Sequence, residues 1–217
     1  MRASREEGMR KLIGILAGMT VAAFCFAEMA RQESWTQALK SHRDVSSTSR
    51  ECFDKALLSA SPQEQIEWYS KAVLKDSKFL EAFVNRGIAR GKNAELPEAI
   101  LDFESAMAID AEDPLPYVNR AYALLLQQNF DAALADYDKA VALDSKNAVI
   151  HNSRAYALYL KGDFTAALKD YDQAIALNPK EAYFYCNRGT LKKQLGNEAG
   201  AKADLERASQ RPPVTHA

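Results

Sequence analysis

Apolar and small residues recur along this chain at a fixed interval of 34 positions. The segment from Tyr117 to Leu124 returns as His151 to Leu158, and a shorter segment, Asp136 to Ala140, returns as Asp170 to Ala174. A repeat of this length is typical of helix pairs that stack, because one pair cannot bury its apolar face without a neighbouring copy. The pattern therefore predicts an all-α chain of stacked helix pairs.

Alignment of the copies gives columns of small residues on both helices of each predicted pair. The first helix carries Gly87, Ala121, Ala155 and Gly189. The second helix carries two alanine columns: Ala99, Ala133, Ala167 and Ala201, then Ala106, Ala140, Ala174 and Ala208. Small side chains let two helix axes approach to about 8 Å, so we expect tightly packed pairs. The bulky columns that fill the remaining space are Phe83, Tyr117, His151 and Tyr185, and Phe103, Tyr137, Tyr171 and Leu205.

This order of aromatic, small and alanine positions resembles the tetratricopeptide repeat family. Four full repeats cover residues 80–213. The resemblance implies a right-handed solenoid of stacked antiparallel helix pairs, the superhelix of that family. The chain departs from the family pattern by carrying arginine where leucine is usual, at Arg86, Arg120, Arg154 and Arg188.

Residues 51–79 keep the repeat phase with weaker matches, and we interpret them as a degenerate first repeat that caps the array. Ser61-Pro62-Gln63-Glu64 is a capping box with proline at the first helical position, so a helix should start there. Asp113-Pro114 predicts another helix start, and Gly162-Asp163 and Gly196-Asn197 each predict the end of one helix and the start of the next.

The last predicted helix differs from the earlier second helices on its outer face. Lys202 stands where they have Ile100, Leu134 and Leu168, and Ser209 stands where they have Met107, Val141 and Ile175. A polar outer face is what a terminal repeat needs for solubility. We therefore expect no further domain after Pro213, and residues 214–217 form a tail.

The N-terminal residues 1–27 do not follow the repeat. A basic start, Met9-Arg10-Lys11, precedes an apolar run from Leu12 to Ala27, and Cys25-Phe26-Ala27 offers a cleavage site; this order is typical of a secretory signal peptide. The run has 16 residues, fewer than a membrane-spanning helix needs. We expect the protein to be exported to the periplasm and its signal peptide to be cleaved. The alternative is an uncleaved inner-membrane anchor, with the protein facing the periplasm. Residues 28–50 are then a flexible spacer.

The net charge and the positions of the cysteines and histidines exclude several classes of function. The net charge of −1 provides no basic footprint for a nucleic acid. Cys52 and Cys186 lie about four stacked repeats apart, roughly 40 Å, so they cannot form a disulfide within one chain. The three histidines lack metal-ligand spacing, and the chain has no phosphate loop or nucleophile elbow. We therefore predict a non-enzymatic protein without metal, cofactor or catalytic residues.

The most regular polar pattern is a column of arginines and a column of aspartates. The arginines are those named above, and the aspartates are Asp102, Asp136, Asp170 and Asp204. Both columns obey the repeat, whereas a catalytic pair would break it. We interpret them as a structural ladder of ion pairs whose arginine stems lie on apolar surface.

The resemblance implies that the first helices line a concave face that holds a peptide or partner protein. Asparagine amides can donate to and accept from a peptide backbone, and tyrosines supply amphipathic contact area. The candidate partner-binding residues are Asn85, Asn119, Tyr122, Asn152, Tyr156, Tyr159, Tyr183 and Asn187. The alternative for some of them is packing between first helices. We expect a scaffold or adaptor, with a self-assembling subunit that stacks end to end as the alternative.

Overall fold

The computed structural model describes residues 46–209, and within this range every regular element is an α-helix. The predicted signal segment, most of the predicted spacer and the tail lie outside the described residues. The helices are α3 (Ser47–Leu58), α4 (Pro62–Lys75), α5 (Leu80–Lys92), α6 (Leu96–Ile109), α7 (Pro114–Leu126), α8 (Phe130–Leu143), α9 (Ala148–Lys161), α10 (Phe164–Leu177), α11 (Ala182–Gln194) and α12 (Glu198–Ser209).

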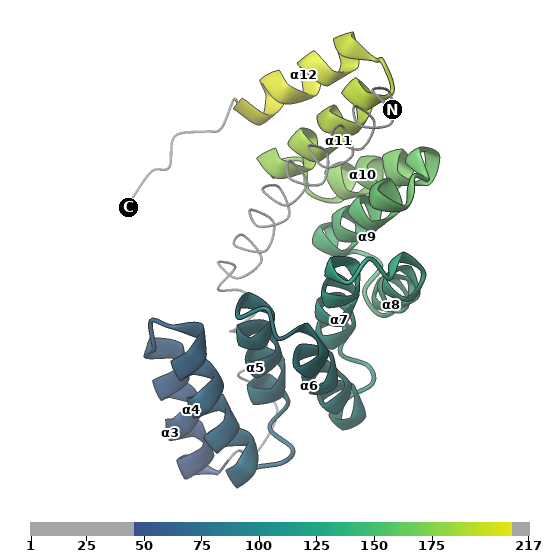
Figure 1. The fold of residues 1–217 in the computed structure, drawn as a ribbon. Helices are drawn as coiled ribbons and strands as arrows, with labels where there is room; N and C mark the ends of the chain where they lie inside the picture. The colour runs from purple at the N-terminus through teal and green to yellow at the C-terminus, as the bar shows by residue number, and fades with distance from the viewer. Residues whose placement is uncertain (1–45, 210–217) are drawn as a thin grey trace, which may run out of the picture. The chain divides into compact units, whose positions relative to one another are not determined.

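Each helix packs against the next one along the chain, and the contact is most extensive within the pairs α3–α4, α5–α6, α7–α8, α9–α10 and α11–α12 (Figure 1). Short connections make the two helices of a pair antiparallel. The predicted all-α solenoid of stacked antiparallel helix pairs is confirmed. None of the helices within residues 46–209 combines the length and hydropathy needed to cross a membrane.

One side of the stack is formed by the first helix of each full repeat. Successive first helices contact each other, α5 with α7, α7 with α9 and α9 with α11, whereas successive second helices do not make contacts of that extent. Closer approach on one side curves a stack toward that side. We call the surface of α5, α7, α9 and α11 on that side the inner wall.

The small-residue columns lie where the helices of a pair meet. Ala99, Ala133 and Ala167 are fully buried, as are Ala106, Ala140 and Ala174. At Gly87 the approach is so close that an added Cβ atom would lie 2.5 Å from the Phe103 ring. Burial of these six alanines confirms the close packing predicted from the sequence.

The predicted helix boundaries follow from side-chain caps. The Ser61 hydroxyl accepts a hydrogen bond from the Glu64 amide at 3.2 Å at the start of α4, and Asp113 accepts from the Leu115 amide at 2.9 Å at the start of α7. Gly162 ends α9 with φ of 92°, a left-handed conformation that favours glycine. Asp163 then caps α10 through the Ala166 amide at 3.1 Å.

The leading helix pair departs from the others in its core. Phe53 fills the small-residue column and is buried, with its ring centroid 5.3 Å from that of Tyr69 and 4.9 Å from that of Phe79. The helix α3 begins at Ser47, inside the predicted spacer, because Ser46 caps it by accepting a hydrogen bond from the Ser49 amide. The core of this pair is therefore aromatic at the position where the full repeats have alanine or glycine.

Candidate functional site

The eight predicted partner-binding residues all lie on first helices. Asn85 is on α5, and α7 carries Asn119 and Tyr122. The other five are Asn152, Tyr156 and Tyr159 on α9, and Tyr183 and Asn187 on α11. The first helices therefore bring them to one side of the array, but their side chains differ in exposure.

Three of the four asparagines are buried and use their amides inside the protein. Asn119 donates from Nδ2 to the Leu115 carbonyl of its own helix at 2.9 Å. Asn187 donates to the Asn152 side-chain oxygen at 3.0 Å, which joins α11 to α9. A ligand would reach these amides only by disrupting internal bonds, and their role in holding one stays a prediction. Asn85 is half-buried at the surface.

The tyrosines also divide by exposure. Tyr183 is buried, and its ring meets Phe184 edge to face with centroids 4.4 Å apart. Tyr156 and Tyr159 are half-buried and stack with centroids 6.3 Å apart. Burial raises the pKa of the Tyr159 phenol, so this group stays neutral around pH 7.

Apolar side chains reach the surface at two equivalent places on the inner wall. Tyr122 and Leu126 lie one turn apart on α7, and Tyr156 and Leu160 occupy the same positions one period later on α9. Leu126 is 38% exposed and the other three are half-buried. We call these four residues the central stripe. Residues four apart on a helix share a face, so the stripe is a two-by-two array.

The charges of α7 and α9 are directed away from this stripe. Their cations within the described structure are Arg120, Arg154 and Lys161, and each forms an ion pair with a carboxylate of a second helix. Neither helix contains an aspartate or glutamate. The central stripe therefore consists of uncharged tyrosine and leucine side chains.

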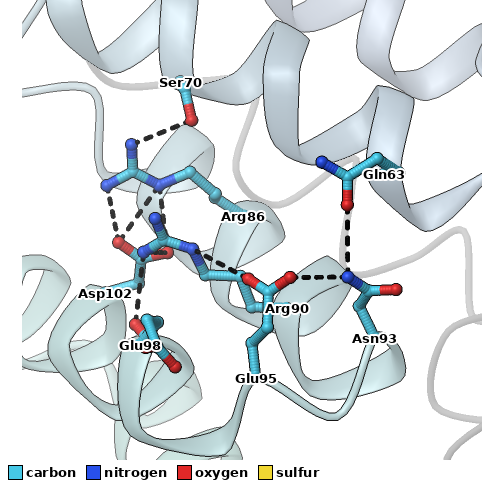
Figure 2. Close-up of polar contacts among 8 residues, drawn as sticks. All are labelled: Gln63, Ser70, Arg86, Arg90, Asn93, Glu95, Glu98 and Asp102. Carbon is cyan, nitrogen blue, oxygen red and sulfur yellow. Dashed lines mark hydrogen bonds and ion pairs between the residues drawn. The ribbon is translucent and has the colours of Figure 1, made fainter.

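The arginine ladder holds each first helix to its second helix, as predicted. Arg120 donates to Asp136 through Nε at 2.8 Å and Nη2 at 2.7 Å, and Arg188 binds Asp204 in the same bidentate way at 2.9 and 2.6 Å. Figure 2 shows the corresponding site in the first full repeat, where Asp102 lies between the guanidinium groups of Arg86 and Arg90. The aspartates are buried, so each requires this cation.

A second set of ladder partners was missed in the sequence. Each arginine also reaches back to the preceding second helix: Arg120 to Glu104 at 3.1 Å, Arg154 to Asp138 at 2.9 Å and Arg188 to Asp172 at 2.7 Å. Arg86 donates to the Ser70 hydroxyl at 3.3 Å in the same position (Figure 2). These partners also recur every 34 residues, so the pattern that predicts the aspartate column could have found them. The ladder thus joins successive repeats as well as helix pairs.

Known protein families match the C-terminal part of this array. The family described as TPR repeat matches residues 122–162 and 155–196, and the one described as Tetratricopeptide repeat matches residues 182–214. Residues 122–214 belong to the tetratricopeptide repeat family. No curated protein sequence matches it.

Solved structures of tetratricopeptide repeat proteins share the fold at low sequence identity. MamA 41-end from Desulfovibrio magneticus RS-1 is 14% identical, covers 80% of this chain and all of its own, and has a TM-score of 0.67. TTC0263, a thermophilic TPR protein of Thermus thermophilus, is 16% identical over 77% of this chain and 93% of its own, with a TM-score of 0.67. YrrB, described as a TPR protein with an unusual peptide-binding site, is 19% identical over 83% and 93%, with a TM-score of 0.59.

The described part of this tetratricopeptide repeat protein contains no cluster of three or more metal-ligating side chains. Cys52 and Cys186 are both free thiols. Two surface features stand out in the described residues: the central stripe on the inner wall, and a pocket at the C-terminal end of the array.

Proposed function

We propose that this protein is a non-enzymatic scaffold that holds a peptide or a partner protein against the central stripe of its inner wall. The observation that carries the proposal is the uncharged Tyr and Leu surface on α7 and α9, whose cations are all paired with second helices. An apolar surface flanked by polar residues is typical of a protein-interaction site.

The stripe matches the spacing of side chains on a bound segment. Neighbouring helix axes lie about 10 Å apart, which equals about three residues of an extended chain or two turns of a helix. Tyr122 and Tyr156 can therefore each contact one apolar side chain of the same partner segment. Their hydroxyls add polar contact, and Asn85 offers an amide at the edge of the wall.

The experiment compares capture by three forms of the protein from a cell extract, with quantitative mass spectrometry. Leu126→Glu introduces a charge into the stripe at an exposed position, and Leu101→Ala is the control because Leu101 is 61% exposed on the second helix α6. A specific partner is expected to lose at least tenfold in capture with Leu126→Glu and to be retained with Leu101→Ala. Equal capture by all three forms would refute binding at the stripe.

The cellular location is part of the same proposal and rests on the N-terminal sequence. A basic start followed by the apolar residues 12–27 supports export, with cleavage favoured over anchorage by the length of the run. Fractionation of the cells, combined with the intact mass of the isolated protein, tests this. A cytoplasmic protein with an uncleaved N-terminus would contradict it.

A further inference from the structure

We call the place where one full repeat packs on the next an internal joint. At each internal joint a helix of the next repeat covers the end surface of the preceding helix pair. The equivalent surface at the C-terminal end of the described array is not covered by a helix. At these joints the second helix offers a carboxylate to the arginine of the next first helix: Glu104 to Arg120, Asp138 to Arg154 and Asp172 to Arg188. Glu206 on α12 occupies the next position in this column. Within the described residues no helix follows α12, and Glu206 lies 3.9 Å from Lys202 of its own helix.

The side chain immediately before each of these carboxylates is buried at the internal joints but partly exposed at the C-terminal end. Phe103, Tyr137 and Tyr171 are buried at the internal joints, whereas Leu205 is 47% exposed. An open pocket of about 350 Å³ lies here, lined by Lys193, Ala201, Lys202, Leu205 and Glu206 among others. Leu205 is the exposed apolar side chain of this pocket, and Glu206 beside it can accept from a cation. Glu198 and Ser209 complete the lining.

We propose that this pocket binds a helix of another protein, and that the helix places an arginine on Glu206 as α11 places Arg188 on Asp172. The internal joints themselves show what covers such a surface: an apolar helix face with one guanidinium. This surface is separate from the central stripe, so the proposal does not depend on the role of the inner wall.

Lys202 stands where the earlier second helices have an aliphatic residue. This difference indicates a second residue that the bound helix should carry. At internal joints the residue three positions after the arginine packs in the same cluster as the aliphatic side chain, Ala123 with Ile100 and Leu191 with Leu168. Lys202 stands in that aliphatic column. An acidic residue three positions after the arginine would face its ammonium group. The partner helix therefore carries the pattern Arg-x-x-Asp or Arg-x-x-Glu on an apolar face.

A second copy of this chain does not offer that pattern at its own first described helix. The position of α3 that corresponds to Arg86 is Cys52, which is buried against its own helix pair. The two ends of the described array are therefore not complementary. This asymmetry favours a different protein over end-to-end stacking of copies.

The test uses a synthetic peptide with the sequence of residues 148–161, which contains Arg154, with Ala157→Glu to supply the acid. A side-chain lactam on the solvent face keeps this short peptide helical, because isolated helices of this length are marginal in water. Isotope-labelled full-length protein is titrated with the peptide and followed by NMR. Saturable shifts of the Ala201, Leu205 and Glu206 amides are expected.

Charge variants decide whether the arginine is recognised by Glu206. Glu206→Lys is expected to weaken peptide binding at least tenfold, and Glu67→Lys, an exposed acid on α4, is the matched control. The peptide with Arg154→Glu should bind Glu206→Arg better than it binds the unaltered protein. Absence of shifts on α12, or equal binding to the unaltered protein and Glu206→Lys, would overturn the proposal. Sedimentation that shows self-association of the full chain, lost in Glu206→Lys, would overturn the choice of another protein as the occupant.

Discussion

Arg154 donates two parallel hydrogen bonds to Asp170, from Nε to Oδ2 at 2.6 Å and from Nη2 to Oδ1 at 2.9 Å. Its remaining nitrogen, Nη1, donates to Asp138 of the preceding repeat at 2.9 Å. The two carboxylates differ in environment, because the Asp170 side chain is 9% exposed and that of Asp138 is 66% exposed. One arginine thus serves a buried bond within a repeat and an exposed bond between repeats.

Removal of this cation should destabilise the protein far more than removal of the outer carboxylate. Arg154→Met keeps an apolar stem but leaves Asp170 buried without its partner, so we expect a loss of about 3 kcal/mol in the free energy of unfolding. Asp138→Asn removes only the exposed partner, and we expect a loss of less than about 1 kcal/mol. Urea denaturation of both variants measures the difference. Similar losses would show that the buried Arg154–Asp170 pair contributes no more to stability than the exposed Arg154–Asp138 pair.

Two glycines of α5 give opposite predictions for the same substitution. A Cβ at Gly87 would lie 2.5 Å from the buried Phe103 ring, whereas a Cβ at Gly91 would meet nothing within 4 Å. Gly91→Ala should stabilise the protein by about 0.5 to 1 kcal/mol, because alanine is the better helix former. Gly87→Ala should lose about 1 to 2 kcal/mol, since displacement of the ring outweighs that gain.

Thermal unfolding of the two alanine variants checks this pair. Stabilisation by both would mean that the Phe103 ring moves aside at little cost, and that the small-residue column at this position is not required by packing.

The 34-residue repeat predicts those structural features that depend on the residue type at a single position of the repeat. Alanine and glycine columns become helix contacts, and Gly162 with Asp163 ends one helix and starts the next, because these features depend on local geometry or on small size alone. The second carboxylate column was equally visible in the sequence. Its contacts join two successive repeats, so pairing the columns within one repeat does not predict them.

The 34-residue repeat does not predict which side chains of the inner wall are buried and which are exposed. Asn152 and Asn187 stand in different columns and are 35 residues apart, yet their amides bond across the joint between α9 and α11. A column relates residues at equivalent positions, so it does not show a contact between two neighbouring columns. The exposure of Tyr122 and the burial of Asn119 depend on this packing between helices, which the interval does not encode.

His151 presents a nitrogen without a hydrogen-bond partner at a position where two of the other full repeats have tyrosine. Tyr117 and Tyr185 donate to the carbonyls of Ala111 and Pro179, six residues earlier, at 3.3 and 3.1 Å. His151 contacts the Ser145 carbonyl through Nε2 at 3.0 Å, so this nitrogen carries the proton, and its buried Nδ1 has no hydrogen-bond partner.

His151→Tyr should therefore stabilise the protein by about 1 kcal/mol, because the tyrosine hydroxyl can make the same loop contact without a buried unsatisfied atom. Urea denaturation at pH 8 measures the change. His151→Phe is the control, since it also removes the unsatisfied nitrogen but cannot donate to Ser145. A loss of stability with tyrosine and a gain with phenylalanine would show that the cavity has no room for the hydroxyl.

Asp204 should make the last repeat sensitive to acid. Burial alone would raise the pKa of its carboxyl, but hydrogen bonds from Arg188 and Lys192 outweigh this and lower the pKa below its usual value. A carboxyl with a lower pKa in the folded state stabilises that state above its unfolded pKa, about 4. This contribution is lost as the pH falls through the folded-state pKa.

Asp204→Asn should consequently be less stable than the unaltered protein at pH 6, by about 2 to 3 kcal/mol, because Arg188 and Lys192 lose their shared anion. The difference should narrow as the pH is lowered toward 3, since protonation removes the same charge from the unaltered protein. Guanidinium denaturation at the two pH values, with Asp172→Asn as the exposed control, measures this. A difference that stays constant with pH would show that Asp204 contributes through packing and not through its charge.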